Sequence, residues 1–423
     1  MARPQGGPGN MVAILGYSRE QIIDAVQSMY TAVADQPWSE FHFPVGRDAC
    51  SVLGYPRTDL DALPEHLVDS FAGVGQPMRA DLISAGDRVL DLGAGAGVDT
   101  LIAAHRAGPQ GRVTALDLTW AMARKLRAEA DAAGAQNIDV VQGGAEALPF
   151  ADETFDVITS NGALNLVPDK RRAIGEMFRV LRPGGRLQIA DVVIRRPVTV
   201  DCESDPRLWV ECVVGATVDD ELKAMFEDAG FENVRVLREF DYFAHSPSAQ
   251  TRDVAAGFGA RSMELAMERG ETAPSRLQQW LRRADPRRVA RMIRRRGLAG
   301  MTSLFLALTA CYGTLLLMGL LAMSGLGIGL NETVWAGAIL VFAVLAAAVV
   351  VAGRRRHRQW GPAITACVGT AVIGYALLID YSFLTELAGF VLLGAGAGWD
   401  LWCNRREQQR ILGLREDSQH ERA

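Results

Sequence analysis

Residues 89–100 read Val-Leu-Asp-Leu-Gly-Ala-Gly-Ala-Gly-Val-Asp-Thr, and the rest of the chain can be ordered around them. The mostly apolar run 88–92 predicts a buried strand of a parallel sheet. Three glycines at alternate positions follow it, Gly93, Gly95 and Gly97. Because glycine tolerates sharp turns and lets a ligand approach the backbone closely, the pattern predicts a binding loop at the end of this strand.

The residues after the glycines strengthen that interpretation. Residues 99–107 predict a helix whose first N–H groups face the ligand. A second strand, 112–117, ends in Asp117, about 20 residues downstream. A carboxylate at that place accepts hydrogen bonds from the hydroxyls of a ribose, so the sequence predicts a nucleoside-binding site.

Strand and helix patterns alternate from residue 87 to about residue 270. This alternation predicts βαβ units with right-handed crossovers and a parallel sheet, with the ligand outside the carboxyl ends of the strands. The expected strands are 88–92, 112–117, 138–142, 155–160, 186–191 and 232–238, and the expected helices are 99–107, 120–133, 169–181 and 219–229.

The spacing Gly-x-Gly-x-Gly resembles motif I of class I S-adenosylmethionine-dependent methyltransferases. Further stretches that resemble this family are 116–119 (Leu-Asp-Leu-Thr), 143–150, 155–161 and 180–185. The resemblance implies a Rossmann-like α/β domain with a mostly parallel sheet and S-adenosyl-L-methionine as the cofactor. The cofactor-binding residues that it implies are Asp91, Gly93, Ala94, Gly95, Gly97, Asp117, Leu118, Thr119, Gly144, Ala145, Glu146 and Asn161.

A helix is also expected before the glycine loop. Ser18 and Gln21 fit a capping box, and apolar residues recur at helical spacing over 22–33. Two interpretations stay open for this helix: it covers the cofactor cleft as a lid, or it only packs against the domain.

The chain of 423 residues changes character near residue 298. Four apolar spans near 300–323, 333–352, 361–379 and 382–402 are each close to the ~20 residues that cross a membrane. Arginines gather before the first span, between the second and third, and after the fourth. By the positive-inside rule, we expect a multi-pass protein of the inner membrane with four transmembrane helices and both ends in the cytoplasm. Glu386 and Asp400 are expected at span ends, in contact with water.

Residues 276–296 hold nine arginines and one acid, Asp285. Apolar residues interleave with them at roughly helical spacing. A nucleic-acid-binding arm would look similar, but the apolar span that follows favours membrane lipids as the partner and not nucleic acid.

The expected organisation therefore has five parts: an N-terminal segment (1–70), a methyltransferase domain (71–270), a basic amphipathic linker (271–297), a four-helix transmembrane domain (298–403) and a cytoplasmic tail (404–423).

Residues 70–268 resemble the arsenite methyltransferase family more specifically, through 160–170, 209–216 and 246–262. The membrane part resembles the MerC mercury-resistance proteins over 354–360 and 398–401. These resemblances imply a soft metal(loid) acceptor, such as arsenic or mercury, held by thiolates.

The cysteines match the arsenite family only in part. Cys212 is retained, whereas Val74 and Gly162 stand where the family has cysteines. Cys202 and Cys50 are candidates to supply the missing thiols. The six cysteines show no paired spacing and predict reduced thiols in a cytoplasm-facing protein.

No nucleophilic side chain is required for methyl transfer from an activated sulfonium, because alignment of the acceptor supplies much of the acceleration. We expect Asn161 to orient the reactants and Cys212 to face the acceptor. Two alternatives stay open. In one, the acceptor is a membrane-soluble small molecule such as a quinone, an isoprenoid or a lipid. In the other, the domain is not catalytic and binds cofactor or metal to gate the membrane module.

Overall fold

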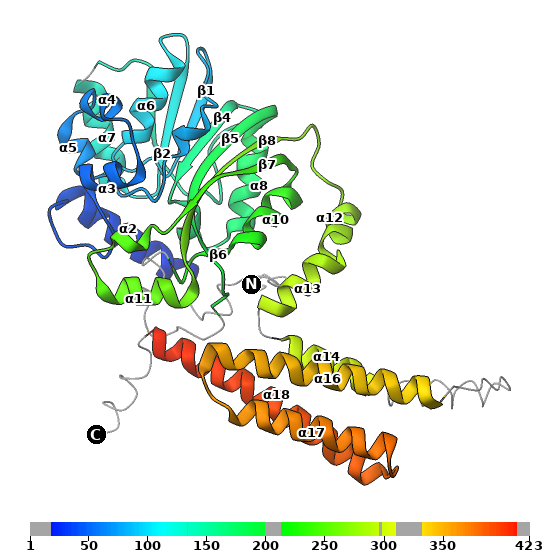
Figure 1. Ribbon diagram of the computed structural model, residues 1–423. Coiled ribbons are helices and arrows are strands. Elements are labelled where there is room, and N and C mark those ends of the chain that lie inside the picture. The colour runs from blue at the N-terminus through cyan, green and yellow to red at the C-terminus, as the bar shows by residue number, and fades with distance from the viewer. Residues whose placement is uncertain (1–17, 133, 199–212, 296–297, 310–331, 413–423) are drawn as a thin grey trace, which may run out of the picture. The chain divides into compact units, whose positions relative to one another are not determined.

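The computed structural model describes residues 18–132, 134–198, 213–295, 298–309 and 332–412 (Figure 1). It divides into two compact units, Met1–Arg282 and Arg283–Ala423. Each unit is described by itself. The five-part organisation expected from the sequence stays a prediction.

The first unit is built on an eight-stranded sheet in the order β3-β2-β1-β4-β5-β8-β7, with β6 paired to β5. Neighbours from β3 to β5 are parallel, and β8 runs antiparallel to both β5 and β7. The predicted mostly parallel Rossmann-like sheet is therefore confirmed. The strands are β1 Arg88–Leu92, β2 Arg112–Asp117, β3 Ile138–Gln142, β4 Phe155–Asn161, β5 Leu181–Ile194, β6 Thr217–Val218, β7 Phe231–Phe240 and β8 Arg261–Arg269.

Helices cover both faces of this sheet. In Figure 1, α6 and α7 lie on one side, and α8 and α10 lie on the other. Apolar side chains of the central strands, such as Leu90 and Ile158, pack with Phe226 of α10 in one buried core. The helices of this unit are α2 Arg19–Asp35, α3 Gly46–Leu53, α4 Arg57–Asp61, α5 Glu65–Val68, α6 Val98–Ala107, α7 Trp120–Ala132, α8 Lys170–Val180, α10 Asp219–Ala229, α11 Ala249–Phe258 and α12 Arg276–Arg283.

Three strands differ clearly from the sequence expectation: β5, β8 and the two-residue β6, which was not predicted. β5 begins at Leu181, before the Pro-Gly-Gly turn, because its register against β4 shifts between Phe155 and Val157 and absorbs the extra residues. β8 was not predicted at all. Its sequence, RSMELAMER, is rich in good helix formers, but its place between β5 and β7 overrides that preference.

The helix expected near residues 22–33 is α2, and its capping box is present. The Ser18 side chain accepts a hydrogen bond from the Gln21 N–H, and the Gln21 side chain accepts one from the Ser18 N–H at 2.8 Å. Both orphan N–H groups at the start of the helix are thereby satisfied. Local sequence alone thus fixes where α2 begins.

The second unit contains helices α13 Pro286–Arg295, α14 Ala299–Leu308, α16 Glu332–His357, α17 Gly361–Leu378 and α18 Phe383–Ile411. Two stretches of its described residues are long and apolar enough to cross a membrane, Ala336–His357 and Gly361–Leu378. The predicted count of four spans is not confirmed. Most of the first predicted span lies outside the described residues, and α18 is not one of the two.

Two acids of α18 lie where the sequence analysis did not place them. Asp400 and Glu386 are buried, with only 5% and 1% of their surface exposed. Asp400 Oδ1 lies 2.8 Å from Nε2 of His357 at the end of α16. The expectation that water reaches these acids is therefore wrong: helix packing and the His357 contact replace hydration at Asp400.

Candidate cofactor and acceptor site

The loop after β1 depends on glycine at two positions. Gly93 has φ +74°, and a Cβ there would lie 2.3 Å from the Ala163 Cβ. Gly97 has φ +105°, and its Cβ would lie 2.2 Å from Leu126 Cδ1. Gly95, in contrast, has φ +55° and open space around it. The loop is therefore packed at both ends and open in the middle, where a ligand can approach the backbone.

Asp117 closes this loop from the end of β2. One carboxylate oxygen accepts the Gly95 N–H at 2.8 Å, and the other accepts the Thr119 N–H at 2.7 Å. Burial raises the pKa of this carboxyl group, and the two N–H bonds together with a hydrogen bond from the Thr119 side chain oppose that rise. A carboxylate has about four lone-pair sites, so Asp117 retains the capacity to accept ribose hydroxyls.

Glu146 lies in the loop after β3 and is only 4% exposed. One of its oxygens accepts the Asp169 N–H at 2.7 Å. The other accepts from Nε of Arg19, the first residue of α2, also at 2.7 Å. This ion pair ties the N-terminal helix to the loop, a link that the sequence analysis missed because the two residues are 127 positions apart.

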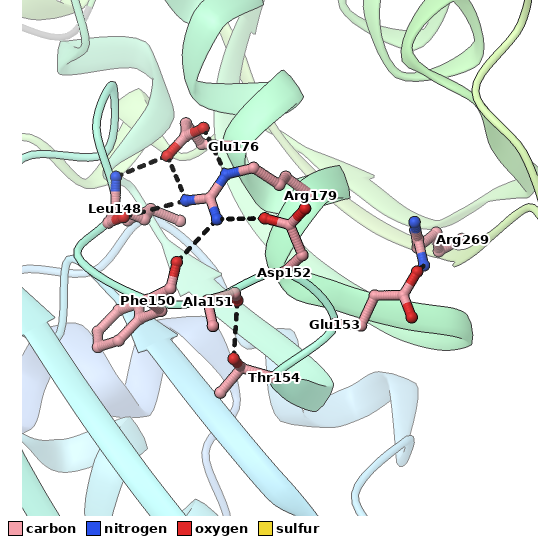
Figure 2. A network of polar contacts seen from close by, with 9 residues as sticks. All are labelled: Leu148, Phe150, Ala151, Asp152, Glu153, Thr154, Glu176, Arg179 and Arg269. Carbon is pink, nitrogen blue, oxygen red and sulfur yellow. Dashed lines mark hydrogen bonds and ion pairs between the residues drawn. The ribbon is translucent and has the colours of Figure 1, made fainter.

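Arg179 of α8 anchors the continuation of the same loop (Figure 2). Its guanidinium donates to the carbonyl oxygens of Leu148 and Phe150 at 3.0 and 2.7 Å. It also pairs with Asp152 and Glu176, each at 2.8 Å. A planar guanidinium with five donors suits such multiple contacts. The loop that follows Glu146 is thereby held to α8.

These elements enclose a cleft with about 1100 Å³ of space, part of it open to solvent. Eleven of the twelve predicted cofactor residues line it, all except Asp91. The cleft is also lined by Ile23, Val26 and Tyr30 of α2, which were not in the predicted set. Of the two interpretations left open for this helix, the structure therefore favours the one in which it covers the cleft. Among the described residues that line the cleft, four are charged: Arg19, Asp99, Asp117 and Glu146.

Asp91 lies beneath the loop. It is 1% exposed, and its Oδ2 accepts from the Thr100 hydroxyl. Burial and the nearby charge of Asp99 raise the pKa of Asp91 to about 8. Asp91 therefore supports the start of α6, and its role as a cofactor-binding residue stays a prediction.

Asn161 at the end of β4 joins three segments of the chain. Its Oδ1 accepts the N–H groups of Val74 and Gly75 at 2.9 and 3.1 Å. Its Nδ2 lies 3.0 Å from the Tyr55 hydroxyl and 2.9 Å from Asp99 Oδ2. The Tyr55 hydroxyl donates to the other Asp99 oxygen at 2.7 Å. Asn161 thus positions the cleft wall, and nothing in the local sequence had pointed to Tyr55.

The structure locates one of the three predicted acceptor-side cysteines. Cys202 and Cys212 lie outside the described residues. Cys50 is fully buried, does not line the cleft, and has its thiol pKa raised to about 12, chiefly by burial. Its burial away from the cleft lends no support to a metal-ligand role for Cys50, which stays a prediction. Within the described ranges, no three His, Cys, Asp or Glu side chains are grouped to hold a metal.

The two positions where the family has cysteines come together in space. A Cβ on Gly162 would lie 3.2 Å from Cγ1 of Val74. Gly162 lines the cleft, and Val74 is 3% exposed behind it. This part of the site is therefore an apolar contact and not a thiol pair.

The arrangement fits S-adenosyl-L-methionine. The open space at Gly95 admits a ligand against the backbone, and the free lone pairs of Asp117 match the ribose. The cleft lining is mostly apolar with a few convergent polar groups, as is usual for small-molecule sites. All three features lie at the carboxyl ends of β1, β2 and β4, where open α/β sheets bind nucleotides.

Comparisons with known proteins agree with this arrangement. Residues 83–230 match the family model described as methyltransferase domain, and residues 298–402 match that of the MerC mercury resistance protein. A C-methyltransferase of ubiquinone/menaquinone biosynthesis (UbiE) from an Enterobacter species is 36% identical over 174 residues, which are 36% of this chain and 69% of that protein. The chain belongs to the S-adenosylmethionine-dependent methyltransferases and carries a C-terminal MerC domain.

Within that class, the sequence is similar to arsenite methyltransferases. The enzyme of Halobacterium salinarum is 41% identical over 184 residues, covering 44% of this chain and 47% of that protein. That of Rattus norvegicus is 31% identical over 192 residues, 43% and 52% of the two chains. The structure of an arsenic(III) methyltransferase from Chlamydomonas reinhardtii is 32% identical, with a TM-score of 0.45, and covers 53% of this chain and 75% of that one. The chain spans about half the length of the first two relatives.

The glycine loop gives a matched set of variants. Gly93→Ala should lower the stability of the methyltransferase unit by about 1–2 kcal/mol, because the new methyl group meets Ala163 at a left-handed residue. Gly95→Ala has space for its methyl group, so it should fold but bind the cofactor more weakly. Gly86→Ala, left-handed but outside the cleft lining, is the control. Thermal unfolding and cofactor titration measure both effects, and equal behaviour of Gly93→Ala and Gly86→Ala would contradict the packing argument.

Asp91 makes stability depend on pH. Its pKa is about 8 in the folded unit and ~3.9 when unfolded, so unfolding releases a proton between these values and stability falls as the pH rises from 4 to 8. Asp91→Asn should therefore stabilise the unit at pH 8 and give little change near pH 4. Calorimetric unfolding without cofactor measures this.

Asp139 provides a control of opposite sign. Its pKa is lowered by the Arg112 hydrogen bond, so Asp139→Asn should destabilise the unit at neutral pH and lose that effect at low pH. Destabilisation of the unit by Asp91→Asn at pH 8, the direction expected of the Asp139 control, would mean that Asp91 is ionised in the native state. The pH dependence attributed to Asp91 would then be wrong.

Proposed function

We propose that this chain is a membrane-anchored methyltransferase that transfers the sulfonium methyl group of S-adenosyl-L-methionine to a soft metalloid with a lone pair, such as As(III). The observation that carries the cofactor part is the cleft, in which the glycine loop, Asp117, Glu146 and Asn161 come together. The likeness to arsenite methyltransferases supports the acceptor class.

The chain's own residues act here by binding and alignment. When bound, S-adenosyl-L-methionine would supply an activated methyl group to a lone pair of the acceptor, such as that of As(III), and the electrons of the broken S–C bond would stay on its sulfur. Asp117 and the loop fix the nucleoside, and Asn161 holds the wall formed by Val74 and Gly75. Helix α2, held by the ion pair of Arg19 with Glu146, covers the cleft and limits the access of water to it.

A thiophilic acceptor needs thiolates, and Cys212, with Cys202, is proposed to supply them. Cys212→Ala should then abolish methylation of As(III) by the full chain in detergent, as followed by transfer of labelled methyl groups. Cys367→Ala, an exposed thiol of the membrane module, is the control and should change nothing. Undiminished metal methylation by Cys212→Ala would contradict this acceptor site.

A second acceptor class is favoured by the apolar contact of Gly162 and Val74 and by the small number of charged groups in the cleft. This acceptor is a membrane-soluble small molecule such as a quinone, an isoprenoid or a lipid. The likeness to a quinone C-methyltransferase also supports it. In this case, the full chain should methylate a lipid extract, and Cys212→Ala should retain that activity. Cofactor binding without any methyl transfer would favour the third possibility, a non-catalytic domain that gates the membrane module.

The membrane topology belongs to the same proposal. We place the protein in the inner membrane as a multi-pass protein with four spans and with the methyltransferase domain and the C-terminus in the cytoplasm. The arginine-rich segment 354–358 and the charge-poor loop 380–382 support this orientation. A reporter fused after Ala423 should be active in the cytoplasm, and activity only outside it would contradict the span count or the orientation.

A further inference from the structure

Helix α12 presents an apolar face to solvent. Leu277, Trp280 and Leu281 are 65%, 63% and 55% exposed. Their spacing of three and four residues places them on one side of the helix. An amphipathic helix normally buries such a face. The described part of the chain leaves it uncovered.

The helix is fixed by contacts that do not use this face. Ser275 and Gln278 form a reciprocal cap: the Gln278 N–H donates to Ser275 Oγ at 3.2 Å, and the Ser275 N–H donates to Gln278 Oε1 at 2.8 Å. Arg282 donates to the Glu227 carbonyl oxygen of α10 at 2.5 Å. The capping contacts specify the helix, and Arg282 attaches it to the methyltransferase unit. The apolar face therefore remains available.

The sequence around this face is strongly positively charged. Residues 276–296 contain nine arginines and only one acid. Arg282 and Arg283 flank the apolar face and are exposed. Arginine binds phosphate oxygens, and tryptophan prefers the boundary between headgroups and acyl chains. The MerC-matched segment, which contains the apolar helices, begins at residue 298, soon after α12 ends in the sequence. Anchoring of that segment in a membrane would therefore keep α12 within reach of the bilayer.

We propose that α12 docks on an anionic lipid surface, with Leu277, Trp280 and Leu281 inserted at the acyl boundary and the arginine-rich segment 276–296 attracted to the lipid phosphates. The proposal rests on the membrane anchoring proposed above. It gives the methyltransferase unit a second attachment to the bilayer, one that depends on lipid charge and ionic strength.

The test uses the full chain reconstituted in vesicles of phosphatidylcholine, with or without phosphatidylglycerol, that carry brominated acyl chains. Bromine quenches tryptophan that enters the acyl boundary. The emission of Trp280 is taken as the difference between the wild type and Trp280→Phe. Trp38, 80% exposed and on another part of the same unit, gives the control through Trp38→Phe.

We expect the Trp280 emission to be quenched in phosphatidylglycerol vesicles and the Trp38 emission to be unchanged. Raising the salt to about 1 M, which shortens the Debye length to about 3 Å, should reduce the quenching. Equal quenching in phosphatidylcholine alone, or none in either vesicle, would overturn the proposal. A blue-shifted but unquenched Trp280 would also overturn it and would indicate a protein partner.

The two proposals fail in different ways. If the chain did not float with vesicles after reconstitution and an alkaline wash, membrane anchoring itself would be wrong. If it floated and Trp280 stayed unquenched, the anchoring would stand and only the docking of α12 would be contradicted.

Discussion

Asp117→Ala is expected to weaken the binding of S-adenosyl-L-methionine by about ten- to a hundredfold. Two effects combine in this variant. The ribose loses hydrogen bonds to a charged acceptor, which are worth ~1.5–3 kcal/mol. The N–H groups of Gly95 and Thr119 lose the oxygens that hold them at 2.8 and 2.7 Å, so the loop itself is less ordered. Calorimetric titration of the full chain in detergent measures the affinity.

A control for this experiment is Asp131→Ala, an exposed acid of α7 that is outside the cleft lining. It removes the same charge and should leave the affinity unchanged. If Asp117→Ala bound the cofactor as tightly as the wild type, the ribose would lie elsewhere, and the assignment of the glycine loop and β2 would have to be abandoned.

Asn161→Ala is expected to lower kcat by about a hundredfold while changing cofactor affinity much less. Asn161 fixes Val74 and Gly75 through its oxygen, and Tyr55 and Asp99 through its nitrogen. Without it, the wall at the reacting end of the cleft shifts, and a displacement of ~1 Å in a positioned site costs about 10²-fold in rate. Steady-state kinetics, with the cofactor affinity measured separately, show whether kcat changes alone.

Asn137→Ala is the matched control for that variant. The side-chain nitrogen of Asn137 also donates hydrogen bonds to the backbone, to the carbonyl oxygens of Ala104 and Gly108, each at 3.3 Å. Asn137 lies outside the cleft lining. It should reduce stability slightly and leave kcat unchanged. A wild-type kcat for Asn161→Ala, with only a lower unfolding temperature, would show that Asn161 is structural and does not position the reactants.

Local and periodic patterns predicted the parts of the fold that depend on nearby residues. Three strand ranges, 88–92, 112–117 and 138–142, agree with β1, β2 and β3, and the Ser18 cap fixes the start of α2. β8 could not be predicted in this way. Its residues favour a helix when considered alone, and only pairing with β5 and β7 makes them a strand.

The same limit applies to the site. Motif spacing predicted eleven residues that line the cleft, because a glycine loop and an acid at a strand end act through backbone geometry. The contacts of Tyr55 with Asp99, of Arg19 with Glu146, and of His357 with Asp400 join residues far apart in the chain. No periodicity relates such partners, so burial and pairing had to come from the three-dimensional structure.

The central claim is that the chain catalyses methyl transfer from S-adenosyl-L-methionine. The most direct measurement incubates the purified full chain in detergent with methyl-labelled cofactor and, separately, As(III), Hg(II) or a lipid extract, and follows S-adenosylhomocysteine and labelled product together. The prediction is that both form in equal amounts with one acceptor, and that neither forms with Asp117→Ala at cofactor concentrations far below its dissociation constant. If the wild type bound the cofactor but formed neither S-adenosylhomocysteine nor labelled product with any acceptor, the claim would be contradicted.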